Sequence, residues 1–135
     1  KLLRDIVALT PRFSEDPACM ERLRSFLVQK RGLVLDFLRS GDLLEHERFA
    51  ELLWAVLHLA DELAARDRLA DLPAEDVRHL HGDCVSVLRL LIPAWADYVR
   101  HLRDDYPYMY AFVLRVNPFV NDDATPSAVT AIVRQ

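Results

Sequence analysis

Glycine is scarce in this chain, with three residues among 135. A phosphate-binding loop, a nucleophile elbow and a dinucleotide-binding turn each need paired glycines at fixed spacing, and none of these patterns is present. The two cysteines, Cys19 and Cys84, lie far apart and form no CxxC pair, so the sequence contains neither a zinc ribbon nor a redox motif. We therefore expect a protein that is not an enzyme.

Long apolar runs and an excess of positive charge are also missing. No run approaches the length that spans a bilayer, and charged residues make up 28% of the chain. A net charge of −4 with intermingled signs gives no basic stripe for a phosphate backbone, so nucleic acid is not an expected partner. The composition predicts a cytoplasmic domain, or the soluble region of a larger membrane protein.

The first residue and the arginine content give hints about the origin of the chain. The chain begins with Lys1 instead of Met and carries no signal-peptide pattern, which suggests a fragment of a longer protein. Only Lys1 and Lys30 are lysine among the 17 basic residues, and all the others are arginine. This bias suggests a GC-rich bacterial genome.

Apolar residues recur at spacings of three and four along most of the chain, which predicts an all-α protein. We expect an antiparallel helical bundle of three long helices, completed by short N- and C-terminal helices. A single domain over residues 1–116 would be followed by an extended, irregular tail over 117–135. The expected helices cover Lys1–Leu9, Pro17–Arg39, a segment from Asp42 to about Arg68, Pro73–Leu102 and Tyr106–Val116.

Several residues mark where these helices begin, end or bend. Asp16 is placed to cap the helix that starts at Pro17, and Gly41 is expected to end it in a left-handed conformation. The apolar pattern continues across Pro93, which predicts a kink of more than about 20° within one helix. Pro107 is expected to turn the chain back into the last helix.

Three histidines each have an acidic residue one helical turn away, which raises the question of a metal site. Helical bundles hold iron with paired Glu-x-x-His motifs, but this chain contains no Glu-x-x-His and no His-x-x-x-His. The face of the helix that carries His58 also points away from its apolar seam. We therefore expect surface pairs, with no metal and no cofactor. The alternative is a small-molecule- or metal-binding bundle whose ligands would be His58, Glu62, His79 and His101.

Aromatic residues crowd the end of the helical region. The segment after Asp105 is apolar on every side, so one face of a bundle cannot cover it. We expect a non-enzymatic interaction or regulatory domain that binds a protein partner or forms a homodimer through aromatic helix surfaces. The expected interface residues are Trp54, Tyr106, Tyr108, Met109, Tyr110 and Phe112.

Overall fold

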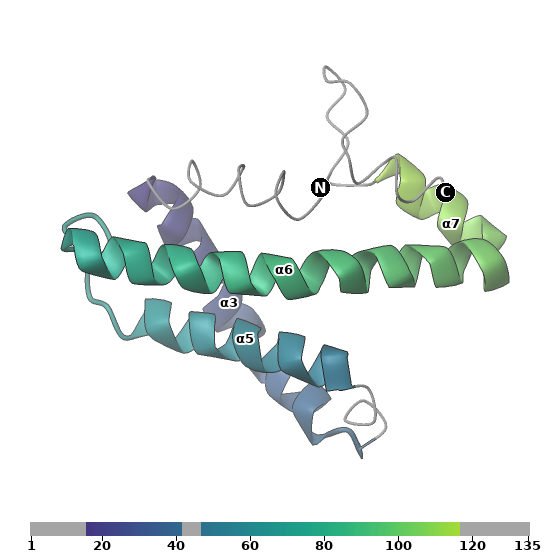
Figure 1. Ribbon diagram of the computed structural model, residues 1–135, viewed down its shortest axis with the longest axis horizontal. Coiled ribbons are helices and arrows are strands. Elements are labelled where there is room, and N and C mark those ends of the chain that lie inside the picture. The colour runs from purple at the N-terminus through teal and green to yellow at the C-terminus, as the bar shows by residue number, and fades with distance from the viewer. Residues whose placement is uncertain (1–15, 42–46, 117–135) are drawn as a thin grey trace.

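Helices make up the regular structure of residues 16–41 and 47–116, the part of the chain that the computed structural model describes. No strand occurs within those ranges, so the expected all-α class is confirmed. The expected N-terminal helix, the expected helix start at Asp42 and the tail over 117–135 lie outside the described residues. The main helices are α3 (Pro17–Arg39), α5 (Glu47–Ala64), α6 (Ala74–Asp105) and α7 (Pro107–Arg115) (Figure 1).

The first described helix, α3, begins where the sequence predicts. The Asp16 carboxylate accepts a hydrogen bond of 2.9 Å from the backbone nitrogen of Ala18, and Pro17 occupies the first turn. The expectation that Gly41 ends this helix in a left-handed conformation is wrong, because no described glycine has a positive φ. The chain instead leaves α3 through Ser40, whose φ of −75° and ψ of 112° are extended.

The central helix is α5, which packs against both α3 and α6. It ends at Ala64, short of the expected Arg68, and the chain then turns so that Arg66 reaches back to Glu62 and across to Asp76. Apolar side chains from all three helices meet where α5 passes between its neighbours. This first core cluster consists of Met20, Leu59, Leu63, Leu69, Leu80 and Cys84.

The longest helix, α6, continues from Ala74 to Asp105 with Pro93 inside it, so the expected continuity across this proline is confirmed. The kink expected at Pro93 stays a prediction.

Burial raises the pKa of the Cys84 thiol to about 11, which keeps it protonated at neutral pH and identifies it as a packing residue. Among the described helices, none is both long and apolar enough to cross a membrane.

The short helix α7 packs against α6 and against no other described helix. Pro107 stands in its first turn and Tyr106 joins it to α6. A second core cluster forms between the two helices from Val99, Leu102 and Val113, with Trp95, Tyr110 and Leu114 packed against it. A position for α7 in a groove between α3 and α5, one way of covering its apolar surface, is therefore excluded.

Candidate metal centre

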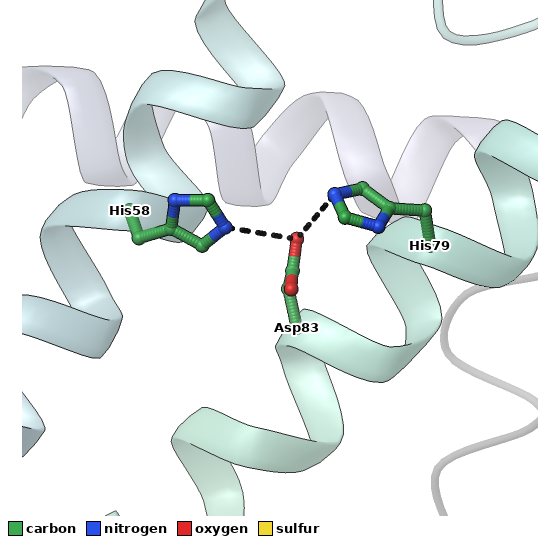
Figure 2. Close-up of side chains that lie close together, drawn as sticks. All are labelled: His58, His79 and Asp83. Atoms are coloured by element: carbon green, nitrogen blue, oxygen red, sulfur yellow. Dashed lines mark ion pairs between the residues drawn. The ribbon is translucent and has the colours of Figure 1, made fainter.

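Two histidine–acid pairs with the same spacing face each other across α5 and α6. His58 and Glu62 lie four residues apart on α5, and His79 and Asp83 lie four residues apart on α6. Residues at this spacing share one face of a helix, so each helix presents an imidazole and a carboxylate together. Figure 2 shows the His58 and His79 rings approaching the Asp83 carboxylate from opposite sides.

The Asp83 carboxylate is the centre of this arrangement. Its Oδ2 atom lies 3.6 Å from His58 Nε2 and 3.4 Å from His79 Nε2. The same oxygen is buried and accepts no hydrogen bond, although the two imidazole rings remain half exposed. Ligand-capable atoms of all three side chains lie within 4.8 Å of one another. A buried carboxylate oxygen without a hydrogen bond is costly, so the geometry calls for a cation or a proton between these groups.

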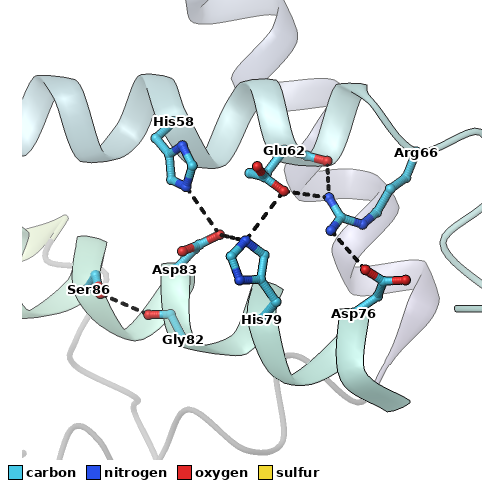
Figure 3. Close-up of polar contacts among 8 residues, drawn as sticks. All are labelled: His58, Glu62, Arg66, Asp76, His79, Gly82, Asp83 and Ser86. Carbon is cyan, nitrogen blue, oxygen red and sulfur yellow. Dashed lines mark hydrogen bonds and ion pairs between the residues drawn. The ribbon is translucent and has the colours of Figure 1, made fainter. Parts of the chain in front are cut away.

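Glu62 stands at the edge of the same cluster (Figure 3). Its Oε2 atom lies 3.5 Å from His79 Nε2 and 2.8 Å from Arg66 Nη1. The pKa of Glu62 lies below its ordinary value, chiefly because Arg66 donates this hydrogen bond to the carboxylate, while burial opposes the shift. Glu62 is therefore ionised at neutral pH and able to act as a ligand.

Arg66 is itself held firmly at the corner between α5 and α6. It donates to the Glu62 backbone oxygen at 2.5 Å and to Asp76 Oδ1 at 3.2 Å, and Arg24 of α3 donates to the Arg66 backbone oxygen at 2.7 Å. The side chain of Arg66 is 16% exposed. The corner thus joins the edge of the histidine cluster to all three packed helices.

Solvent reaches the cluster from the outer side of α6. An open depression of about 420 Å³ on α6 includes His79, Gly82 and Asp83 in its lining. The remaining residues that line the depression are Glu75, Arg78 and Ser86.

The structure brings two of the four alternative metal ligands, His58 and His79, together with Asp83. Glu62 lies beside His79 at 3.5 Å but outside this group of three, whereas His101 pairs with Asp105 at 2.8 Å and packs its ring against Tyr106. Asp83 is not among the ligands that the sequence suggests. The signal was available, since Asp83 follows His79 at the same spacing that separates His58 from Glu62.

The expected interface residues differ in how far they face solvent. Tyr108 is 92% exposed, and Trp54, Tyr106, Met109 and Phe112 are each about half exposed. Tyr110 instead packs against the second core cluster. The outer surface of α7 is therefore apolar and open, but Tyr110 belongs mainly to its inner side.

Comparisons with known proteins place the chain among uncharacterised helical domains. The model of a family described as "Uncharacterized protein MJ1433, C-terminal helical domain" matches residues 1–115. The uncharacterised protein MJ1433 of Methanocaldococcus jannaschii is 47% identical over 100 residues, which cover 74% of this chain and 40% of that protein. This relative is archaeal, so the bacterial source suggested by the arginine content gains no support. No solved structure matches the chain.

Proposed function

The chain belongs to the family of the MJ1433 C-terminal helical domain, and we propose that it is a non-enzymatic module that binds one divalent metal ion of the zinc class. His58, His79 and Asp83 are the proposed ligands. The observation that carries the proposal is the buried Asp83 Oδ2 atom, which accepts no hydrogen bond and lies between two imidazole nitrogens at 3.4 and 3.6 Å. The proposal assumes the antiparallel bundle expected from the sequence. In that bundle the His58–Glu62 pair of α5 faces the His79–Asp83 pair of α6.

The separations between the donor atoms favour zinc over magnesium. A tetrahedral ion with bonds of about 2.0–2.2 Å separates neighbouring donor atoms by about 3.3–3.6 Å. Octahedral magnesium, with bonds of about 2.0–2.1 Å, would require about 2.8–3.0 Å and oxygen ligands. The 3.4 and 3.6 Å between the Asp83 oxygen and the two imidazole nitrogens lie within the tetrahedral range, and imidazole nitrogen suits zinc.

A cytoplasmic setting is part of the proposal. Cys19 and Cys84 are both free, and unpaired cysteines are typical of reducing compartments. The Ser86 hydroxyl, one helical turn from Gly82, donates to the Gly82 backbone oxygen at 2.9 Å (Figure 3).

Zinc titration of the purified, metal-free protein tests the proposal. We expect one zinc ion per chain by calorimetry, and we expect Asp83→Asn to weaken binding by more than about 100-fold because the amide cannot supply the anionic oxygen. His101→Ala is the matched control, since His101 also has an acid four residues later but stands apart from the cluster. Equal zinc affinity of Asp83→Asn and the parent protein would show that Asp83 is not a zinc ligand and that the cluster is not the metal site.

A second function is favoured by the outer surface of α7. We propose that the domain also self-associates, because Tyr108, Met109 and Phe112 form an exposed apolar surface next to Tyr106. A two-fold dimer through α7 would place each copy of this surface against the other. Such an interface must bury at least about 1,000 Å² in total to be stable.

Sedimentation of a charged variant tests this second function. Tyr108→Asp combined with Phe112→Asp should convert a dimer into a folded monomer, because both side chains face solvent in the single chain. Phe26→Asp is the control, since Phe26 is 56% exposed on a different helix. A parent protein that is already monomeric at micromolar concentration would disprove self-association.

A further inference from the structure

We infer that the proposed metal ion keeps one coordination position open to solvent, and that this position takes a carboxylate from outside the chain, which Arg78 also binds. The inference rests on the proposed metal-binding function. Ligand atoms of His58, His79 and Asp83 lie within 4.8 Å of one another, and the described residues add no fourth side chain to this group. A tetrahedral ion with three protein ligands has one position left for an exchangeable ligand.

Glu62 does not fill this position, although it is ionised and lies near His79. It stands outside the group of three, and its Oε2 atom accepts a hydrogen bond of 2.8 Å from Arg66 Nη1. Arg66 is held in turn by Asp76 at 3.2 Å. The Glu62 carboxylate therefore already has a charged partner on the side of the cluster away from Asp83 (Figure 3).

The metal ligands are open to solvent on the surface of α6. His79 and Asp83 both line the depression of about 420 Å³, and the side chains of His58 and His79 are 56% and 52% exposed. Sites for small molecules usually have volumes of about 300–1,000 Å³. A small ligand in this depression would thus lie against two of the three proposed metal ligands.

The charge of the loaded site favours an anion as this ligand. Two neutral imidazoles and the Asp83 carboxylate leave a divalent ion with one positive charge. The charge of Glu62 is offset by Arg66, and the charges of Glu75 and Arg78 in the depression offset each other. One anionic oxygen donor would neutralise the site, and carboxylate oxygen is an ordinary zinc ligand.

Arg78 is the second contact that we assign to the carboxylate. It precedes His79 on α6 and lines the same depression. Within residues 16–41 and 47–116, no ion pair engages its guanidinium group, whereas Arg66 has two acidic partners. Guanidinium groups bind carboxylates through strong charge-assisted hydrogen bonds. We expect one oxygen of the bound carboxylate on the ion and the other on Arg78.

Acetate titration of the cobalt(II)-loaded protein tests the open position, because the visible absorption of cobalt changes when one of its ligands is exchanged. We expect a saturable spectral change with one acetate per ion, and no change with perchlorate at the same ionic strength. Arg78→Gln should weaken acetate binding by about 10-fold and leave cobalt affinity unchanged, because the guanidinium group contacts the anion and not the metal. The matched control is Arg89→Gln, which removes the same charge from α6 outside the depression and should bind acetate as the parent does.

A short peptide with blocked ends and one glutamate distinguishes the source of the carboxylate. Peptide binding at least as tight as acetate binding would assign the position to an acidic side chain of a protein partner, and weaker peptide binding would assign it to a small carboxylate. No spectral change with either ligand, in protein that holds one cobalt ion, would overturn the inference and leave the proposed function standing. Equal acetate affinity of Arg78→Gln and the parent would remove Arg78 from the site. Failure of the parent to bind cobalt or zinc would overturn the proposed function itself.

Discussion

Zinc at 100 times its dissociation constant is expected to raise the free energy of unfolding by about 2.7 kcal/mol. The ion joins α5 to α6 in the folded protein, and the unfolded chain does not hold His58, His79 and Asp83 together. For a domain of this size, the melting temperature should rise by roughly 10 °C. Circular dichroism at 222 nm, with zinc and then with excess chelator, measures the change and its reversal.

Two variants separate the cluster from other sites on the protein. His79→Ala removes the imidazole that lies near both Asp83 and Glu62, so zinc should no longer raise the melting temperature. His101→Ala should keep the full effect, because His101 pairs with Asp105 outside the cluster. A rise of the same size in His79→Ala would show that zinc stabilises the protein from a different place.

Acid should remove the effect of zinc before it disturbs the Arg66–Glu62 pair. Protons compete with metal for imidazole nitrogen, so the rise in melting temperature should shrink toward about pH 5. Hydrogen bonding by Arg66 lowers the pKa of Glu62 below its ordinary value of 4.5. A carboxylate with a depressed pKa stabilises the fold above its unfolded pKa and loses that contribution only as the pH falls through its folded pKa. The Arg66–Glu62 pair therefore persists through the range in which zinc is lost.

Local sequence signals predict the individual helices well. The start of α3 follows from Asp16 and Pro17, because capping and the first-turn preference of proline act within a few residues. The continuity of α6 follows from apolar spacing that persists on both sides of Pro93. The end of α5 could not be predicted in the same way, since it depends on Arg66 meeting Asp76 of another helix.

The candidate metal centre depends on tertiary packing, which spacing within one helix cannot reveal. The pairing of His58 with Glu62 is visible in the sequence, but the face that carries them looked solvent-exposed because it lies opposite the apolar seam. In the structure His58 is 56% exposed, and its ring nevertheless lies 3.6 Å from Asp83 of α6. The burial of the Asp83 oxygen arises from this approach and has no signature in the local sequence.

In the aromatic segment that forms α7, the sequence predicts the helix, whereas tertiary packing decides which of its side chains are buried. The sequence predicts that Pro107 begins a short helix that is apolar on every side, and the structure contains that helix as α7. Sequence alone treats Tyr108 and Tyr110 alike. Packing of α7 on α6 separates them, because Tyr110 contacts the second core cluster while Tyr108 is 92% exposed.

Replacement of Leu63 by alanine is expected to lower the free energy of unfolding by about 2–5 kcal/mol, the usual range for a fully buried leucine. Leu63 is 0% exposed and lies in the first core cluster together with Met20 of α3 and Leu80 of α6. The loss includes both the transfer free energy of the missing methyl groups and the cavity that they leave. It is a large part of the roughly 5–15 kcal/mol that stabilises a typical domain.

Guanidinium denaturation followed by tryptophan fluorescence measures this loss, since Trp54 and Trp95 lie on helices that the core cluster joins. The midpoint should fall while the dependence on denaturant stays the same, because the surface exposed on unfolding hardly changes. Leu33→Ala makes the same chemical change at a side chain that is 52% exposed on α3, and it should alter stability by less than about 0.5 kcal/mol. Equal losses in the two variants would mean that α3, α5 and α6 do not share the first core cluster, and the alignment of His58 with Asp83 would lose its structural basis.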